Sequence, residues 1–347
     1  MPMIASILLA AASFLGACSQ SNAPDTTLPG EAPVPDRTAF AKGADVSWVT
    51  QLEKEGQKFY DKEGKPVECM QLLRDECGVN AIRLRVWVNP KDGWNGIEDV
   101  MVKARRAKSL GLRLMIDFHF SDHWADPGQQ ETPDAWKDYD MGQLKEAVAG
   151  HVKEMLGRLK AENIEPEWVQ VGNETRTGML YPLGNSKNEQ NFTDLVNAGY
   201  DAVKSIFPGA AVIIHIDNGY QLDLYTYIFS ILKKCNGKYD MIGMSLYPSV
   251  DDWREKVNSC VANINTLAAM YGRPVMICEI GMDYDRPKES KEFVAALKEK
   301  CEKETGGNCK GIFWWEPEAP AGYNGGYTKG CFKDGRPTEA LDAFKEN

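Results

Sequence analysis

The stretch Val169-Gln-Val-Gly-Asn-Glu-Thr175 is a short apolar run that leads into a polar pair, Asn173 and Glu174. Later in the chain, Pro274-Val-Met-Ile-Cys-Glu-Ile-Gly281 has the same design and delivers Glu279. Strands that are buried on both faces read as continuous apolar runs. A carboxylate at the far end of such a strand has a high desolvation cost, which favours a functional role over a structural one. We therefore predict that Glu174 and Glu279 face each other across one cleft.

These two runs belong to an alternation that continues unbroken from residue 39 onward. Each short apolar run is followed by a loop and by a segment with helical periodicity. Eight strands alternating with eight helices predict a parallel sheet in the α/β class, and the count of eight favours a closed (β/α)8 TIM barrel. No Gly-rich phosphate fingerprint follows the first run, which argues against an open dinucleotide-binding sheet. The predicted strands span residues 42–48, 80–87, 112–120, 167–173, 211–217, 240–247, 274–281 and 310–315, and the predicted helices lie near residues 66–77, 97–110, 141–163, 191–206, 220–235, 252–271, 288–304 and 337–346.

The N-terminal residues differ in composition from the rest of the chain. Residues 1–17 form an apolar segment, and in Leu15-Gly-Ala-Cys18 small residues precede the cysteine, as they do before the cleavage site of a signal segment. The pattern resembles the lipobox of bacterial lipoproteins, in which the cysteine becomes the lipidated N-terminus, although no Lys or Arg precedes the apolar run. Residues 18–38 are rich in Ser, Pro and Asp and predict a flexible tether. We expect a signal segment (1–17), a tether (18–38) and one barrel domain (39–347), anchored by lipid at the bacterial cell envelope or, alternatively, secreted.

The charge of the chain excludes some partners and its aromatic content suggests another. A formal net charge of −10 and a pI near 5.1 argue against nucleic acid, because no basic surplus exists to neutralise phosphates. Nine Trp, 13 Tyr and 12 Phe are present, and several Trp lie in predicted loops. Most of the rings are expected in the core, and some as platforms for a flat-faced ligand such as a sugar.

The cysteines and histidines carry weaker signals. Eight cysteines remain besides Cys18, and in an exported protein Cys301 and Cys309, which flank a Gly-Gly-Asn turn, are the best candidates for a disulfide. Cys278, inside an apolar run, reads as a small buried hydrophobe. No CxxC pair is present, and His119 and His123 lie at a strand end rather than on a helix, so we predict no metal. His151, in an ordinary helix, is expected at the surface.

Active sites of this fold lie at the C-terminal ends of the strands. Reading those positions and the loops after them gives a cluster of polar and aromatic side chains. Some of them have structural alternatives: Arg83 or Arg85 as a partner in a buried ion pair, and Asp117 with His119 as a hydrogen-bonded pair. The predicted substrate-binding residues are Asp45, Arg83, Arg85, Trp87, Asp117, His119, Trp124, Asp126, Asn173, His215, Asp217, Tyr247 and Trp315.

Two carboxyl groups that flank one sugar are the requirement of glycoside hydrolysis. We predict that Glu174 is the general acid/base, with a pKa raised by desolvation and by the second carboxylate. Glu279 is the predicted nucleophile, kept ionised by Arg83 or Arg85. Asn173 is placed to bond the sugar 2-hydroxyl, and Trp315 to stack beneath the ring.

The chain resembles the clan of retaining glycosidases in which an Asn-Glu pair ends strand four and a single Glu ends strand seven. Within that clan it is similar to the endo-β-1,4-galactanases of glycoside hydrolase family 53, over nearly all of residues 40–320. By this resemblance Glu174 is the acid/base and Glu279 the nucleophile. The matching stretches include Lys42-Gly-Ala-Asp-Val-Ser47, Phe59-Tyr-Asp61, Arg83-Leu-Arg-Val-Trp-Val-Asn-Pro90, Asp117-Phe-His-Phe-Ser-Asp-His-Trp-Ala-Asp-Pro-Gly128, His215-Ile-Asp-Asn-Gly219, Asp240-Met-Ile-Gly-Met-Ser245 and Trp315-Glu-Pro317.

The chain also departs from the family pattern. Ser245-Leu-Tyr-Pro248 keeps one of the two tyrosines that commonly precede this proline, and the segment from Met282 to Ser290 is short. Some bacterial members have a longer loop here that contributes to a calcium site, so we predict no such calcium and no other cofactor. The resemblance implies hydrolysis of the β-1,4-galactan of plant pectin (type I arabinogalactan), and a monomer is the default expectation for an enzyme that degrades a polymer. The alternatives are another glycosidase of the clan, acting on mannan, xylan or glucan, and a non-catalytic glycan-binding lipoprotein.

Overall fold

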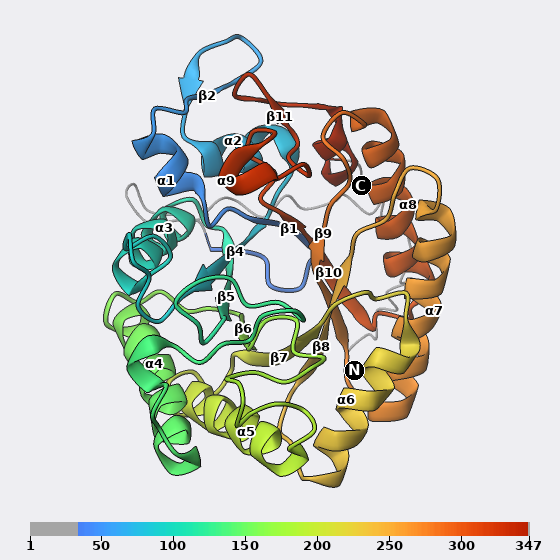
Figure 1. Cartoon of the computed structure of the whole chain (residues 1–347). Helices are drawn as coiled ribbons and strands as arrows, with labels where there is room; N and C mark the ends of the chain where they lie inside the picture. Colours follow the sequence, from blue (N-terminus) through green and yellow to red (C-terminus); the bar gives the residue numbers. More distant parts are fainter. Residues whose placement is uncertain (1–33, 346–347) are drawn as a thin grey trace, which may run out of the picture. The chain divides into compact units, whose positions relative to one another are not determined.

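A computed structural model of the protein describes residues 34–345. Eight parallel strands close into a barrel in the order β1-β10-β9-β8-β7-β6-β5-β4, which confirms the predicted (β/α)8 fold (Figure 1). Each predicted strand contains its observed counterpart to within one residue at either end. The strands are β1 (Ala41–Asp45), β4 (Ala81–Val86), β5 (Arg113–Phe118), β6 (Trp168–Val171), β7 (Ala211–Ile216), β8 (Met241–Leu246), β9 (Val275–Ile280) and β10 (Cys309–Trp315).

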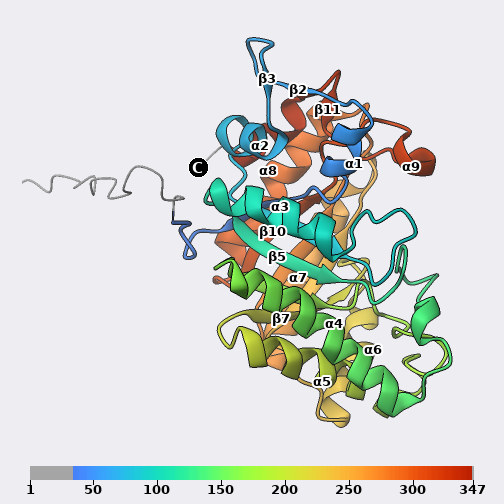
Figure 2. The same ribbon diagram turned by 90° about the vertical axis from the view of Figure 1, so that its left-hand side faces the viewer.

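Seven long helices in the described residues surround the barrel (Figures 1 and 2). Their ends follow capping chemistry: Asp140 and Gln143 form a reciprocal capping box at the start of α4, and Gly78 closes α2 in the left-handed conformation. The helices are α2 (Cys69–Cys77), α3 (Ile97–Ser109), α4 (Met141–Ala161), α5 (Glu189–Ile206), α6 (Leu222–Lys234), α7 (Trp253–Tyr271) and α8 (Pro287–Glu304).

The apolar residues form two layers, one on each side of the barrel wall. Met115, Trp168 and Phe313 belong to a small cluster inside the barrel, and the large cluster lies between strands and helices. Because alternate side chains of a strand point to opposite faces, this double burial explains the continuous apolar runs in the sequence. Gly43 on β1 is needed for packing, since a Cβ there would lie 2.1 Å from the ring of Phe313.

The structure adds short elements that the alternation did not predict. They are α1 (Val49–Lys54), the hairpin of β2 (Phe59–Tyr60) and β3 (Pro66–Val67), the 3-10 helix η1 (Asp134–Trp136), α9 (Tyr323–Gly326), and the hairpin of β11 (Phe332–Lys333) and β12 (Arg336–Pro337). The helix predicted near 337–346 was wrong in part: the chain forms β12 and then the 3-10 helix η2 (Glu339–Phe344). Pro337 pairs with Phe332 in the β11–β12 hairpin, so the helical turn begins only at Glu339.

Two further predictions need correction. His151 is buried against Phe118, Phe120 and Trp136 and is not at the surface, because α4 turns this face toward the barrel. Cys301 and Cys309 are both buried but are free thiols, as are the other six cysteines of the described residues. Cys278 is fully buried, as predicted.

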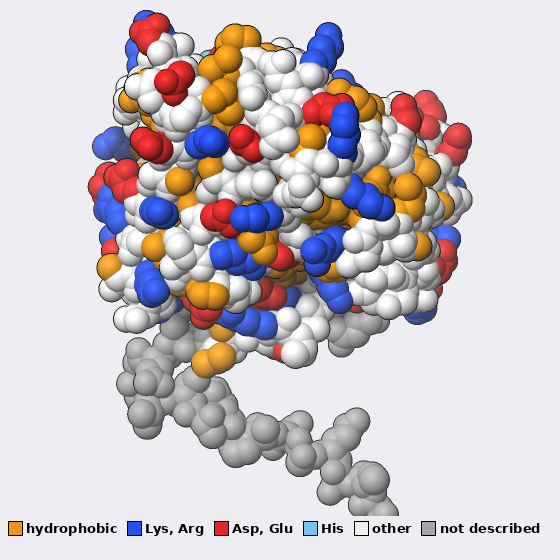
Figure 3. Space-filling view, turned by 90° about the horizontal axis from the view of Figure 1, so that it is seen from below, with side chains coloured by type: hydrophobic (Ala, Val, Ile, Leu, Met, Phe, Trp, Pro, Cys, Tyr) orange, Lys and Arg blue, Asp and Glu red, His pale blue; other side chains and the backbone are white. Residues whose placement is uncertain are grey.

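The predicted signal segment and most of the tether, including Cys18, lie outside the described residues. Within residues 34–345, no helix is long and apolar enough to cross a membrane. On the face drawn in Figure 3, acidic and basic side chains are interspersed.

Candidate active site

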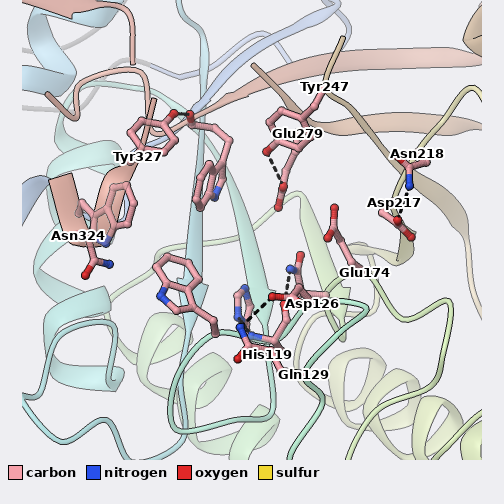
Figure 4. Close-up of a pocket in the computed structure, with 15 residues that line it drawn as sticks. His119, Asp126, Gln129, Glu174, Asp217, Asn218, Tyr247, Glu279, Asn324 and Tyr327 are labelled. Carbon is pink, nitrogen blue, oxygen red and sulfur yellow. Dashed lines mark hydrogen bonds between the residues drawn. The ribbon is translucent and has the colours of Figure 1, made fainter. Parts of the chain in front are cut away.

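A pocket of about 490 Å³ lies at the C-terminal end of the barrel. Glu174 and Glu279 both line it, and Figure 4 shows their carboxyl groups pointing into the same space. Of the predicted binding residues, seven also line it: His119, Trp124, Asp126, Asn173, Asp217, Tyr247 and Trp315. The barrel therefore brings side chains from six strand ends to one site.

Glu174 is positioned by the backbone that follows β6. Gly172 has a φ of 86° and Glu174 a φ of 47°, so the chain turns sharply as it leaves the strand. The turn is held by hydrogen bonds from the Gln130 side chain to the Asn173 carbonyl at 2.8 Å and from the Thr175 N–H to the His215 carbonyl at 2.9 Å. A left-handed conformation at a residue other than glycine is strained and persists where surrounding structure fixes it, often at functional sites.

Glu279 lies on β9 and is held by two neighbours. Arg83 Nη2 contacts Glu279 Oε1 at 2.9 Å, and the Tyr247 hydroxyl donates to Glu279 Oε2 at 2.7 Å. Both oxygens of this carboxylate therefore have a partner that stabilises the ionised form. Arg83, rather than Arg85, is the cation beside the predicted nucleophile.

The two glutamates differ in their electrostatic environment. Burial, followed by the charge of Glu279, raises the pKa of Glu174 well above its usual value. Burial also raises the pKa of Glu279, to about 7, against the opposing effects of Arg83 and Tyr247. Arg83 and Tyr247 stabilise the ionised form of Glu279, whereas Glu174 has no cation beside it, so these neighbours favour loss of the proton from Glu279 before Glu174. This order matches the roles predicted from the sequence.

Arg83 is the centre of a buried polar network beneath the pocket. The strand register places Asp45 next to Arg83, and Nη1 donates to Asp45 at 2.7 Å. Nη2 donates to Asp117 at 2.9 Å and to Asn173 at 3.0 Å, and Nε donates to Gln170 at 2.8 Å. This single guanidinium thus links the predicted nucleophile to Asn173, the residue before the predicted acid/base.

Arg85 has a different environment, inside an aromatic cluster. Its guanidinium lies 4.4 Å from the ring centre of Trp124, 5.1 Å from Trp48 and 5.4 Å from Trp87, and it forms an ion pair with Glu316. Trp124 and Trp315 border the pocket as part of this cluster. Arg85 therefore supports the aromatic wall from behind.

Direct substrate contact was predicted for several residues that do not line the pocket. Arg85 and Trp87 lie behind Trp124. The remaining four, Asp45, Arg83, Asp117 and His215, are fully buried, and their charges and hydrogen bonds are satisfied within the barrel. Asp117 and His119 form the hydrogen-bonded pair given as a structural alternative, at 2.9 Å. The predicted binding residues that do not line the pocket are Asp45, Arg83, Arg85, Trp87, Asp117 and His215.

The pocket also has lining residues that the sequence did not indicate. Tyr327 donates its hydroxyl to the Trp315 carbonyl, and Asn324 is its neighbour in the segment after β10. Neither position follows a strand directly, so no strand-end signal points to them. Trp48, Ala125, Gln129 and Asn218 complete the lining.

The side chains of residues 34–345 include no group of three or more His, Cys, Asp or Glu arranged to hold a metal ion. The segment between β9 and α8 is short, Gly281–Arg286. The absence of a calcium site and of a cofactor stays a prediction from the sequence.

The barrel and the carboxylate pair in its mouth together define a glycoside hydrolase. The family model of glycosyl hydrolase family 53 matches residues 41–345, and the chain belongs to this family.

Individual relatives agree with the family assignment. A probable arabinogalactan endo-β-1,4-galactanase A from Neosartorya fischeri is 31% identical over 265 residues, covering 74% of each chain. An uncharacterized protein encoded in the bgaB 5′ region of Niallia circulans is 34% identical over 249 residues, covering 70% of this chain and 67% of the relative. A solved structure of a fungal β-1,4-galactanase superposes with a TM-score of 0.82 at 26% identity, over 89% of this chain and 100% of that one.

Proposed function

We propose that this protein is a retaining endo-β-1,4-galactanase that cleaves the galactan of plant pectin (type I arabinogalactan). The observation that carries the proposal is the pair Glu174 and Glu279, which share one pocket but differ in their proton affinity. Family membership and the galactanase names of the relatives support the choice of substrate.

In the first half-reaction, the ionised Glu279 attacks the anomeric carbon of the sugar. The bond to the leaving-group oxygen breaks, and Glu174 gives its proton to that oxygen. Arg83 and Tyr247 hold the attacking carboxylate in place through contacts to its two oxygens. The sugar is then bound to Glu279 through an ester linkage.

In the second half-reaction, the ionised Glu174 takes a proton from water, and the water oxygen attacks the anomeric carbon. Glu279 leaves as a carboxylate, and Glu174 is again protonated. Two inversions at one carbon retain the β-configuration. Asn173, held by Arg83 and by the Ala125 carbonyl, faces the pocket beside Glu174 as the proposed partner of the sugar 2-hydroxyl.

The decisive experiment is the time course of products from linear β-1,4-galactan. Internal cleavage, with a mixture of oligosaccharides before monosaccharide, is expected of an endo-enzyme, and NMR of the first product is expected to show the β-anomer. Early release of galactose alone would refute endo action, and prompt appearance of the α-anomer would refute retention. Equal activity on mannan, xylan or glucan would overturn the substrate assignment. Binding of galactan without any cleavage would favour the non-catalytic alternative.

We also propose that Cys18 carries a lipid that anchors a monomeric enzyme at the cell envelope. The support for this proposal is the Leu15-Gly-Ala-Cys18 pattern in the sequence. Mass spectrometry of the N-terminal peptide is expected to show the lipid, and Cys18→Ser is expected to move the protein to the soluble fraction. An unmodified Cys18 would refute the anchor.

A further inference from the structure

Behind Glu174 a line of three polar groups runs from the pocket into the barrel. Glu174 Oε1 lies 2.5 Å from Ser245 Oγ, and Ser245 Oγ lies 2.8 Å from His215 Nε2. The other ring nitrogen, His215 Nδ1, lies 2.9 Å from Asn173 Oδ1. Ser245 and His215 are both buried, so these contacts do not exchange freely with water.

The Asn173 amide determines which nitrogen of His215 carries the proton. Its Nδ2 donates to the Ala125 carbonyl at 2.9 Å, and its Oδ1 accepts from Arg83 at 3.0 Å. The atom that faces His215 Nδ1 is therefore an acceptor, and Nδ1 must donate. Gln170 Nε2 lies 3.1 Å from Nδ1 and directs one of its two N–H groups to Asp117 Oδ1 at 2.9 Å. If Nδ1 accepted the other N–H, two acceptors, Nδ1 and Asn173 Oδ1, would face each other at 2.9 Å, so the tautomer with the proton on Nδ1 is favoured.

His215 carries only one N–H. Burial, followed by the charge of Arg83, lowers the pKa of His215 well below its usual value, so the ring is neutral. With the proton on Nδ1, Nε2 is an acceptor and takes the single hydrogen of the Ser245 hydroxyl. The two oxygens of the Ser245–Glu174 contact lie 2.5 Å apart, a distance that suits either direction of donation. With its own hydrogen directed to His215, Ser245 Oγ accepts from the O–H of protonated Glu174.

The direction must reverse when Glu174 loses its proton. A carboxylate only accepts, and hydrogen bonds to an ionised acceptor are stronger than those to a neutral one. The Ser245 O–H therefore turns from His215 to Glu174. This needs only rotation about the Cβ–Oγ bond, and no proton leaves Ser245 or His215.

We propose that Ser245 is a rotating donor that keeps Glu174 in place in both of its protonation states, and that His215 sets the resting direction of this donor. The inference rests on the proposed function, in which Glu174 alternates between acid and base. Ser245 and His215 are positioning residues, because neither needs to touch the substrate. Glu174 must donate a proton and regain it at the same oxygen. A hydrogen-bonding partner that accepts from the protonated form and donates to the ionised form holds this carboxyl group in place throughout.

Other titratable groups lie close to Glu174 and His215, and the variants described below do not alter them. Glu174 faces Glu279 from β9, Asp217 from the end of β7 and Asp126 from the loop after β5. His215 faces Arg83 from β4 and both Asp117 and His119 from β5. A shift in the titration of Glu174 between variants therefore reports the change at Ser245 or His215.

The first test is ¹⁵N NMR of histidine in the whole protein, which has four histidines. His215 is identified as the signal that is missing in His215→Phe or, if that variant does not fold, as the one unaffected by substitution of the other three. We expect a neutral ring with the proton on Nδ1. A proton on Nε2, or a charged ring at neutral pH, would overturn the proposal.

The second test is the pKa of Glu174, followed by ¹³C NMR of its carboxyl group and identified by loss of the signal in Glu174→Gln. Ser245→Ala removes the donor to the ionised form, so the pKa of Glu174 is expected to rise. His215→Phe removes the competing acceptor, so the same pKa is expected to fall. If Ser245 and His215 had only structural roles, the two variants would not shift the pKa of Glu174 in opposite directions. Shifts of this pKa in the same direction would overturn the proposal.

Kinetics link these readouts to the reaction. For Ser245→Ala, the basic limb of kcat/KM on galactan is expected to follow the NMR shift to higher pH, with kcat reduced more than KM is changed. The matched control is Ser249→Ala, which changes an exposed serine outside the pocket and keeps the backbone N–H that donates to Asp252. Neither NMR test requires turnover. A protein with the expected NMR behaviour but no activity on galactan would refute the proposed function and leave the hydrogen-bond assignment intact.

Discussion

Arg83 contacts Glu279 at 2.9 Å while it also holds Asp45 and Asp117 inside the barrel. One cation thus serves both the predicted nucleophile and the buried network beneath it. Removing a partner from a buried ion pair costs about 3–5 kcal/mol, because a charge is left without compensation. The same side chain, Arg83, therefore contributes to the stability of the barrel and to the ionisation of Glu279.

Arg83→Gln is expected to lower the free energy of unfolding by about 3–5 kcal/mol in urea denaturation. The pKa of Glu279 is expected to rise, since the charge of Arg83 lowers it, and the acid limb of kcat/KM then moves to higher pH. Arg105→Gln, which breaks an exposed pair with Glu162, is the control and should change stability much less than Arg83→Gln. An unchanged acid limb in folded Arg83→Gln would contradict the assigned role.

Tyr247→Phe removes the hydroxyl that donates to Glu279 at 2.7 Å. This hydrogen bond favours the ionised carboxylate, so its loss is expected to raise the pKa of Glu279 and to reduce kcat/KM most on the acid side. The pH profile of the variant is the measurement. Tyr284→Phe changes a half-exposed tyrosine in the segment after β9 and should leave the profile as it is. If Tyr247→Phe and Tyr284→Phe had the same pH profile of kcat/KM, the hydrogen bond from Tyr247 would have no effect on the pKa of Glu279.

The two glutamates are expected to respond differently to truncation. General acid catalysis contributes about 10²–10⁴-fold, so Glu174→Ala should lose roughly that factor on galactan. On a dinitrophenyl β-galactobioside, whose leaving group needs no proton, the first step should be much less affected. Glu279→Ala should lose activity on both substrates. Initial rates and burst kinetics measure this, and the reverse pattern would exchange the assigned roles.

Arg85 and Glu316 are expected to depend on each other. Arg85→Met keeps much of the apolar contact with Trp124 but leaves the Glu316 carboxylate buried without its cation. The single variant should be destabilised by about 3–5 kcal/mol, and Arg85→Met combined with Glu316→Gln should regain part of that loss. Urea denaturation of the four proteins in the cycle is the measurement. Additive losses would mean that the two residues do not interact.

Glu318 is expected to make stability depend on pH. Its carboxyl group is buried beside that of Glu316, and burial followed by the charge of Glu316 raises its pKa well above the usual value. A raised pKa in the folded state means that the stabilising contribution is complete below the unfolded pKa, about 4.3, and is lost as pH rises through the folded pKa. The Glu318→Gln protein should lose less stability than wild type as the pH is raised toward alkaline values. Urea denaturation at several pH values tests this, and parallel curves would contradict it.

The sequence determined the barrel and the main features of its mouth. The apolar runs contain β6 and β9 because a strand buried on both faces tolerates few polar residues, and parallel strands align their C-terminal ends. This alignment is enough to assign Glu174 and Glu279 to one rim of the barrel. His151 was misjudged because a single polar residue in a helix does not reveal which face the helix buries.

Only the tertiary structure decided which side chains reach the pocket and which support it. Arg83 and Arg85 lie two residues apart on β4, yet one holds Glu279 and the other supports Trp124, because the partners come from β9, β10 and a loop distant in sequence. Likewise the contact of Ser245 with Glu174 depends on the packing of β8 against its neighbours. A sequence pattern specifies local conformation and burial, whereas distances across the barrel are set by its closure.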